Sequence, residues 1–435
     1  MSRIRADRYT NREGTGAPTF ADGVNVVGIS SLGITTVTGV GQTALTVNGD
    51  ARITGVLTVG QGSVTIGSTN ITTQYINDIQ YPTAGPLSNR NLVINGAMNV
   101  AQRGTAAETV DTDGKYRIDR FKTYASASNT HVVAQSQDSD VPTGQGFTNS
   151  YKLEVTTAAA TPSAGYVFLA QSIEGYNSNV LSYGNANCKT VTISFWVKCS
   201  VVGTYGIVLR NSLLNYNYTG EYSISASGVW EYKTITIPGA DAGSWQTTNE
   251  TGVEVLFGID VGSDFEGITN TWQNSNKLST PGMTNTWSDT VNNVFLLTGL
   301  QLEIGSRATP FEHRSFHDEQ LKCMRYYQHF GNALASDDGT DDGFMMFHNW
   351  ATTTAYGAQK FIVPMRARPS LTSPSSGLTY YSGGSLDSSI NLDLIGANTN
   401  NGELRINDVS GLTQGTSGWL RIEGSGAYIA FSAEL

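Results

Sequence analysis

The sequence predicts a mainly β fold that is divided into several domains. Only 14% of the 435 residues are charged, whereas the chain contains 48 glycines and 20 tyrosines. Such a composition favours strands separated by turns. Short runs of alternating apolar residues recur along the chain, and only one clear helical pattern interrupts them. The length predicts two to four domains.

Composition also excludes several classes of function. The formal net charge of −10 argues against nonspecific nucleic-acid binding, which needs a basic face. No apolar run reaches the roughly 20 residues of a membrane helix, so we expect no membrane insertion. The first residues lack the apolar core of a Sec-type signal peptide. The cysteines are odd in number and have no CxxC spacing, which predicts reduced thiols from a chain made in a cytosol: Cys188, Cys199 and Cys323.

The stretch 299–330 predicts a strand followed by a helix. Apolar residues first recur at every second position, which is the strand period: Leu300, Leu302 and Ile304. Ser315 is a favourable N-cap, and Asp318 follows it at the capping-box distance. Apolar residues then recur at helical spacing: Phe316, Cys323, Tyr327 and Phe330. We therefore expect a linking helix over 316–330.

Residues 1–23 contain too few apolar side chains to fold alone. Four arginines are spread through them among acidic and turn-forming residues: Arg3, Arg5, Arg8 and Arg12. The segment is therefore either a disordered tail or an arm that becomes ordered when these arginines dock on a partner.

Residues 24–77 form a second unusual segment, because Asp50 and Arg52 are the only charged residues in its 54 positions. Short alternating pieces end in turns at intervals of about ten residues, and Asn48-Gly49 is a strong hairpin signal. Strands this short need neighbours to cover their apolar side. The neighbours are either the next rung of a single-chain solenoid or the same rung of two other chains. A Pro- and Gly-containing linker follows, so the segment extends over 24–89.

The region 90–315 predicts a two-sheet sandwich, because several strand-like runs alternate with turn-rich loops. These runs are Tyr116–Tyr124, Tyr166–Gln171, Val191–Lys198, Tyr205–Leu209, Tyr232–Ile237 and Val253–Ile259. In Val191–Lys198, four apolar residues face one side and Trp196 faces the other. Asp119 and Arg120 are adjacent charged residues for which we expect a structural role rather than a catalytic one. In this role the two side chains tie a strand end to a loop through a charge-assisted pair.

Aromatic residues that lie in polar stretches of the sequence are the candidate binding residues. In the central region these are Trp245, Trp272 and Trp287, which either stack on sugar rings or anchor loops to the ends of the sandwich. In the region 331–435 they are Trp350, Tyr380, Tyr381 and Trp419, which either recognise a surface or pack between subunits.

No motif predicts a catalytic or metal site. The acidic loop Asp337, Asp338, Asp341 and Asp342 lacks the twelve-residue calcium frame. His313 and His317 are four residues apart, but His313 precedes the predicted helix, which argues against a zinc pair. We therefore expect no metal, no cofactor and no enzymatic activity, although paired carboxylates of a glycosidase leave no signal in sequence.

Five segments resemble, in order, parts of the carbohydrate-binding-module-like jelly-roll domain of bacteriophage tail-fibre proteins: NLVINGAMNVAQRGT, YRIDRF, VTISFWVK, TITIPGADAGSW and LQLEIGSRATPFE. The start, MSRIRADRYTNREGTGAPTF, resembles segments of structural proteins from phages of cyanobacteria and other marine hosts. LTVNGDARITGVLTVG is similar to a three-chain β shaft. KFIVPMRARPSLT and AYIAFSAEL resemble the ends of tail-fibre chains.

The resemblance implies an elongated homotrimeric fibre. Its parts would be a virion-docking arm (1–23), a β-repeat shaft and linker (24–89), a jelly-roll sandwich (90–315), a linking helix (316–330) and a C-terminal β domain (331–435). Such a fibre is assembled in the host cytoplasm, binds other virion proteins through its arm and attaches to a host-surface glycan or protein. We place recognition in 331–435 more than in the jelly roll. The alternatives are a purely structural head, neck or baseplate fibre, or a component of a carbohydrate-processing depolymerase.

Overall fold

The computed structural model describes residues 74–76, 79–81, 88–331 except 111 and 113, and 342–435 except 374–376, 389, 408 and 423–426. The predicted arm, with its four arginines, and most of the predicted shaft lie outside these residues, as does most of the acidic loop. Near the end of the predicted shaft, β1 (Gln74–Ile76) pairs antiparallel with β2 (Ile79–Tyr81). The rest of the described chain is mainly β, as the composition predicts.

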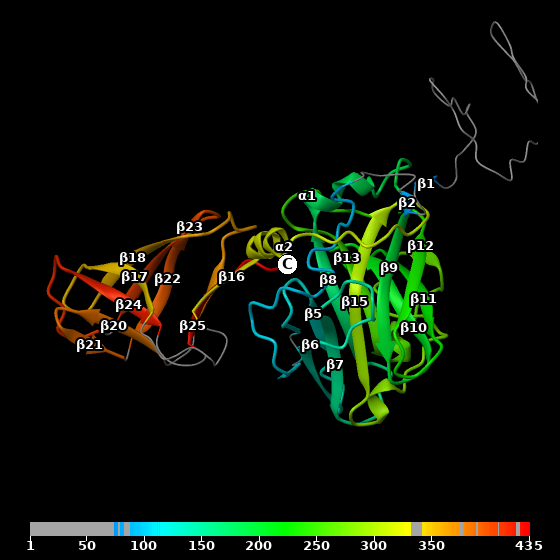
Figure 1. Ribbon diagram of the computed structural model, residues 1–435, viewed down its shortest axis with the longest axis horizontal. Helices are drawn as coiled ribbons and strands as arrows, with labels where there is room; N and C mark the ends of the chain where they lie inside the picture. Colours follow the sequence, from blue (N-terminus) through cyan, green and yellow to red (C-terminus); the bar gives the residue numbers. More distant parts are fainter. Residues whose placement is uncertain are drawn as a thin grey trace, which may run out of the picture. The chain divides into compact units, whose positions relative to one another are not determined.

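Two antiparallel sheets form a β-sandwich. The first sheet contains β3 (Glu108–Thr109), β6 (Val132–Asp138), β7 (Ser150–Thr157), β9 (Val191–Cys199), β12 (Glu231–Ile237) and β15 (Val294–Ile304). Its order is β12-β9-β15-β7-β6-β3, and Figure 1 shows β12, β9, β15 and β7 side by side.

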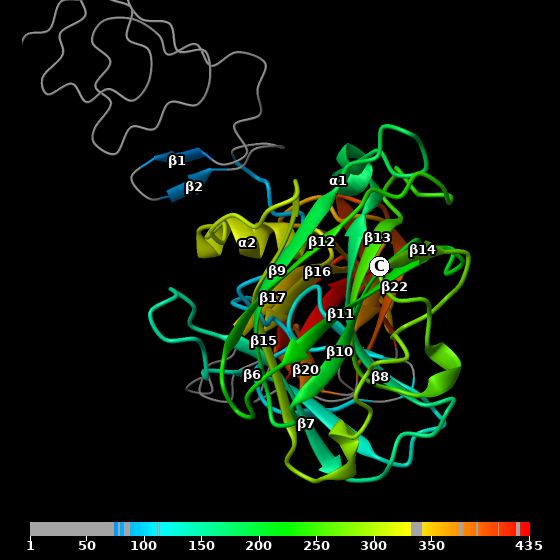
Figure 2. The same cartoon turned by 90° about the vertical axis from the view of Figure 1, so that its right-hand side faces the viewer.

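The second sheet contains β4 (Lys115–Tyr116), β5 (Lys122–Ala125), β8 (Tyr166–Glu174), β10 (Gly203–Arg210), β11 (Asn217–Ile224), β13 (Thr251–Val261) and β14 (Thr271–Gln273). Its order is β14-β11-β10-β13-β8-β5-β4, and the labels β11, β10 and β8 mark it in Figure 2. The chain passes repeatedly from one sheet to the other, as a jelly roll does.

The core of the sandwich lies between the inner faces of the two sheets. Alternate residues of β9 enter it, as the period-two pattern predicts: Val191, Ile193, Phe195 and Val197. Trp196 is on the opposite face. A short helix, α1 (Gly175–Ser178), and three 3₁₀ turns connect strands: Asn179–Leu181, Ser263–Phe265 and Trp287–Asp289. The three cysteines are free thiols, and burial raises the pKa of Cys199 and Cys323.

The predicted strand Tyr116–Tyr124 is wrong in its centre. A turn separates β4 from β5, and in this turn Arg120 has a φ of +74°. Asp119 and Arg120 are both buried, but they do not pair with each other. Asp119 accepts hydrogen bonds from Gln102, and Arg120 forms an ion pair with Glu434. Both side chains tie this turn to other segments of the chain, through partners that the sequence pattern did not identify.

The predicted linking helix is correct at its start and wrong at its end. α2 (Phe316–Met324) begins at Ser315, whose hydroxyl accepts a hydrogen bond from the Asp318 backbone at 3.2 Å. The chain then forms β16 (Tyr327–Gly331), which pairs with β25 (Tyr428–Ser432). This pairing with a distant strand satisfies the backbone groups of residues 327–331, so it overrides the local helical spacing.

The distal region also contains two sheets. β16, β25 and β19 (Ser370–Thr372) form the smaller sheet. The larger sheet contains β17 (Asp342–Asn349), β18 (Ala355–Lys360), β20 (Leu378–Ser382), β21 (Ser385–Asp387), β22 (Asn391–Ala397), β23 (Asn401–Asn407) and β24 (Ser417–Ile422). Its order is β21-β20-β24-β17-β18-β23-β22. A shared core that includes Phe347, Leu404, Leu420 and Phe431 makes this a second β-sandwich, as expected.

Candidate functional site

The outer face of the first sheet carries a groove of about 850 Å³ over β12, β9 and β15. Because successive side chains of a strand point to opposite faces, the positions between the core residues of β9 line its floor. The floor consists of cross-strand pairs with aromatic or hydroxyl side chains: Trp196 with Tyr232, Ser194 with Thr234, and Thr192 with Thr236.

Trp196 and Tyr232 form an aromatic platform on this floor. Their ring centroids are 5.3 Å apart, and the ring planes meet at 45°. Tyr232 is 44% exposed, and Trp196 is partly buried. Such rings offer an apolar face to a ligand, while the exposed hydroxyls of Thr234 and Thr236 donate and accept hydrogen bonds. The hydroxyls of Thr192 and Ser194 are buried. The platform therefore combines stacking and polar recognition in one groove.

Three further aromatic rings line the groove beside β15. Phe147, Phe311 and His313 contact one another, with ring centroids 4.9–5.2 Å apart. Gly299 makes this packing possible, because a Cβ at that position would lie 2.6 Å from the ring of Phe147. Its φ of +63° also favours glycine. The loop 305–313 thus builds a wall whose position depends on a glycine within β15.

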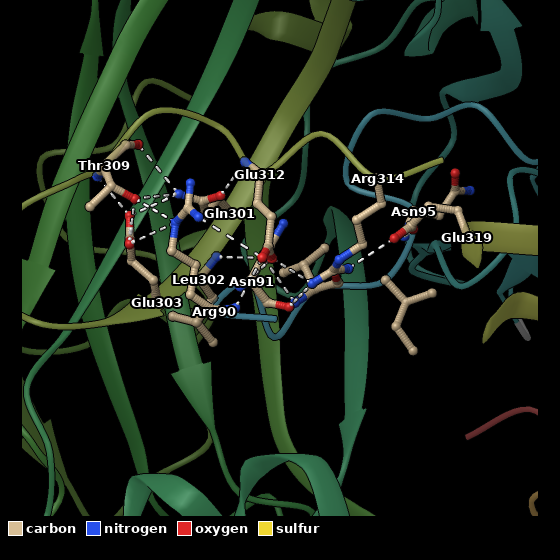
Figure 3. Close-up of polar contacts among 12 residues, drawn as sticks. Arg90, Asn91, Asn95, Gln301, Leu302, Glu303, Thr309, Glu312, Arg314 and Glu319 are labelled. Atoms are coloured by element: carbon tan, nitrogen blue, oxygen red, sulfur yellow. Dashed lines mark hydrogen bonds and ion pairs between the residues drawn. The ribbon is translucent and has the colours of Figure 1, made fainter. Parts of the chain in front are cut away.

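A buried polar network holds this loop against β15 (Figure 3). Glu303 is 1% exposed, and its carboxylate accepts hydrogen bonds from Gln301 at 2.8 Å and from the Thr309 backbone at 2.8 Å. The Thr309 hydroxyl donates to the same carboxylate at 2.7 Å and accepts from the Arg90 guanidinium at 2.8 Å. Gln301 and Glu303 are buried although they occupy the polar phase of the strand, because the loop covers them.

Glu312 and Arg314 extend the network along the loop (Figure 3). The Asn91 backbone donates to Glu312 at 3.0 Å, and Arg314 donates to it at 2.9 Å. Burial works to raise the pKa of Glu312, but the Asn91 hydrogen bond and the charges of Arg314 and Arg90 outweigh it. The pKa of Glu312 therefore lies below its ordinary value of 4.5. Arg314 also pairs with Glu319 of α2 at 2.8 Å.

The predicted tryptophans of the central region do not form the groove. Trp287 is fully buried, so the prediction that it stacks on a ligand is wrong: its ring packs in the sandwich core. Trp245 and Trp272 contact each other, with centroids 5.7 Å apart. Their indole N–H groups donate to the carbonyls of Ala242 and Pro238 at 2.9 and 2.8 Å. These contacts are those that loop anchoring requires.

The predicted distal residues divide between the two faces of a sheet. Tyr380 is 1% exposed and donates a hydrogen bond to Asn349 at 2.6 Å, so it faces the core and is a wrong candidate. Tyr381, the next residue in β20, faces outward, because neighbouring residues of a strand alternate. Trp419 in β24 is also exposed, and Trp350 after β17 is 63% exposed. The binding roles of these three residues stay predictions.

Trp196 and Tyr232 are the binding candidates that sequence reasoning missed. A signal was present, because both residues occupy the polar phase of an alternating strand, in VTISFWVK and EYKTITI. Large aromatic residues at outward positions of a sheet are informative. The pattern does not reveal that β12 and β9 are neighbours, and this pairing is what turns two exposed rings into one platform.

The histidines and carboxylates do not gather into a metal centre among the described residues. His313 is in the groove wall, whereas His317 is on α2. The helices of the described ranges include none that is long and apolar enough to cross a membrane.

No protein-family model matches the chain, and no curated protein matches it by sequence. Several solved structures are similar to about half of it. The enzymatically active domain of bacteriophage CBA120 tailspike protein 4 is 14% identical, with a TM-score of 0.29 over 52% of this chain and 24% of that chain. The chain thus spans about a quarter of the tailspike domain.

Two carbohydrate-binding modules are similar over their whole length. A family 4 module is 14% identical, with a TM-score of 0.26 over 48% of this chain and 98% of that chain. The family 11 module from Clostridium thermocellum, solved with a β-1,3-1,4-mixed-linked tetrasaccharide, is 15% identical, with a TM-score of 0.23 over 48% and 99%. Likenesses of this size do not assign a function, so the function is argued from the groove.

Proposed function

We propose that the protein binds saccharide chains in the groove over β12, β9 and β15, without altering them chemically. The observation that carries the proposal is the platform of Trp196 and Tyr232 beside the exposed hydroxyls of Thr234 and Thr236. A pyranose ring has apolar C–H faces and hydroxyls at its edge, which match an aromatic face and neighbouring hydrogen-bonding groups. Arg307 in the lining adds a cation for a polar or acidic substituent.

We propose further that this binding serves a virion fibre, as in a phage tail fibre that attaches to the host surface. The sequence resemblance supports this role, with residues 1–23 as the virion-docking arm. The nearly uncharged segment 24–77 supports a homotrimer, because the short strands that its sequence predicts need neighbours to cover them, and in a trimer two other chains would supply these. A trimer would present several copies of one groove, and multivalency converts weak saccharide contacts into firm attachment.

Binding of the full-length protein to an array of neutral and acidic tetrasaccharides tests the groove. We expect selected saccharides to bind, and Trp196→Ala and Tyr232→Ala each to reduce their affinity roughly 10-fold or more. Tyr176→Ala is the matched control, because that ring is 62% exposed and lies outside the groove lining. Saccharide binding that survives both groove substitutions in folded protein would place the site elsewhere.

Two measurements test the fibre role. Sedimentation of the full-length chain should give a trimer mass, and a monomer mass would contradict the assembly. Deletion of residues 1–23 should abolish incorporation into particles while saccharide binding persists. Normal incorporation of the shortened chain would move docking to another segment.

A further inference from the structure

A row of exposed apolar side chains crosses four strands of the larger distal sheet. Leu386 of β21 is directly opposite Tyr381 of β20, Tyr381 is opposite Trp419 of β24, and Trp419 is opposite Met346 of β17. Residues directly opposite in an antiparallel ladder share a face. The four side chains are 55%, 36%, 48% and 53% exposed in this order. We call these four residues the distal row.

The distal row departs from the pattern of a sheet with one buried face. Tyr380, Leu420 and Phe347 alternate with the row along the same strands and are buried in the core. The outward positions of such a sheet are ordinarily polar, yet here four consecutive strands each present a large apolar side chain. Arg421, on the same face of β24 as Trp419, has its guanidinium 5.0 Å from the Tyr381 ring centroid, so a cation borders the row.

The exposed area of the row matches the apolar part of a protein interface. With about 200 Å² for a large side chain, the row exposes roughly 400 Å². This is the size of the largest apolar patches found on monomers, which are often functional. A standard interface buries about 800 Å² on each partner, and about 56–58% of it is apolar, which is roughly 450 Å². The row thus provides most of the apolar surface that one side of such an interface needs.

We propose that the distal row is a contact between copies of this chain. None of its four side chains is charged at neutral pH, and the neighbouring Arg421 guanidinium lies over the Tyr381 ring, which partners the cation where rows meet. Every copy carries the same row, so the rows of all copies can converge on the symmetry axis of a closed assembly, including the three-fold axis of a trimer. Leu386 and Met346 have no ring face for a saccharide to stack on, so the row as a whole fits a protein surface better than a glycan. This contact does not depend on saccharide binding in the groove.

Hydroxyl-radical footprinting of the full-length protein over a range of concentrations tests the contact directly. We expect Trp419, Tyr381 and Met346 to lose reactivity together as the protein associates. Tyr176 of α1, which is 62% exposed and outside the distal sheets, should keep a constant reactivity. Equal reactivity of the row and Tyr176 at every concentration would overturn the proposal. Protection that appears only after a saccharide is added would also overturn it, because the row would then bind a ligand.

Substitution provides a second readout. Trp419→Ser should weaken the contact roughly 10-fold or more, so Tyr381 and Met346 should regain reactivity even where residues 24–77 keep the copies together. Tyr176→Ser is the control and should leave the protection unchanged. Saccharide affinity should be the same in both variants. Full protection of Tyr381 and Met346 in folded Trp419→Ser protein would contradict the contact, and the footprint of the unaltered protein decides the matter if that variant fails to fold.

Discussion

The outer faces of the two large sheets expose aromatic rings in different surroundings. In the groove, Trp196 and Tyr232 stand among hydroxyls, and a loop held by buried polar groups forms a wall beside them. In the distal row, Trp419 and Tyr381 stand between Leu386 and Met346. Strand alternation exposes the rings in both places, but the neighbours decide what they can bind. A ring among hydroxyls fits a saccharide, and a ring among aliphatic side chains fits another protein surface.

The largest expected difference between the two faces comes from replacing a flat ring by an aliphatic side chain. Trp196→Leu removes the stacking face, so we expect saccharide affinity to fall roughly 30-fold or more. Trp419→Leu keeps an apolar side chain, so copy-to-copy association should change by about 3-fold or less. Titration calorimetry and sedimentation measure the two effects. Equal sensitivity of both faces to the loss of a ring would remove the distinction.

A second effect separates the walled groove from the flat row. Glu303→Ala removes the acceptor of Thr309 and Gln301 and leaves buried donors without a partner, which costs about 1–3 kcal/mol. We expect the loop 305–313 to loosen and saccharide affinity to fall roughly 10-fold. Protection of the distal row should persist. Hydrogen exchange of the loop provides the measurement, and an unchanged loop with weakened binding would mean that the wall is held by other contacts.

Lowering the pH should weaken saccharide binding in the groove and leave the protection of the distal row unchanged. The folded-state pKa of Glu312 lies below its ordinary value of 4.5, so the stability contributed by this group is fully present above pH 4.5 and is lost as the pH falls through the folded pKa. We expect saccharide affinity to decline below that pH by a few fold. Glu312→Gln should make binding less dependent on acid pH. The distal row contains no group that titrates in the acid range, so its protection should be constant.

The smallest expected effect concerns a single hydroxyl of the floor. Thr234 is exposed and faces the groove, so Thr234→Val keeps the β-branched shape and removes one hydrogen-bonding group. We expect a loss of about 0.5–1.5 kcal/mol in binding free energy and little change in stability. The same affinity in both proteins would show that the ligand contacts the rings alone.

Local patterns predicted about half of the strands of the sandwich, because the period of two is present in each strand separately, and they missed strands such as β6, β7 and β11. In VTISFWVK the inward residues and the outward Trp196 follow from the letters alone. Prediction failed where a partner distant in sequence decides the outcome. Tyr327 and Phe330 have helical spacing but join a strand because residues 428–432 pair with them. Gln301 and Glu303 occupy the outward positions of an alternating strand, which are ordinarily exposed. They are buried because the loop that follows the strand covers them.

The candidate site was harder to predict than the fold for the same physical reason. Tyr380 and Tyr381 are adjacent residues of the same type, so the sequence does not show which of them faces the core. A shift of one residue exchanges the core face for the outer face. The platform needs Tyr232 of β12 beside Trp196 of β9, and only the order of strands in the sheet reveals this. The sequence analysis instead selected aromatic residues in polar loops as binding candidates, although Trp287 in one such loop packs in the core.

The ion pair of Arg120 with Glu434 has a consequence for the order of events during synthesis. The two residues are 314 positions apart, and Arg120 is buried in the sandwich. The sandwich is complete only after β15, which ends at Ile304, and a ribosome that adds about 5–20 residues per second takes roughly 6–26 seconds more to reach residue 434. During that interval a complete sandwich would hold a guanidinium without its carboxylate, which is costly in a buried position. The turn that contains Arg120 is translated before most of the sandwich. It should nevertheless reach its final conformation only after Glu434 has been added.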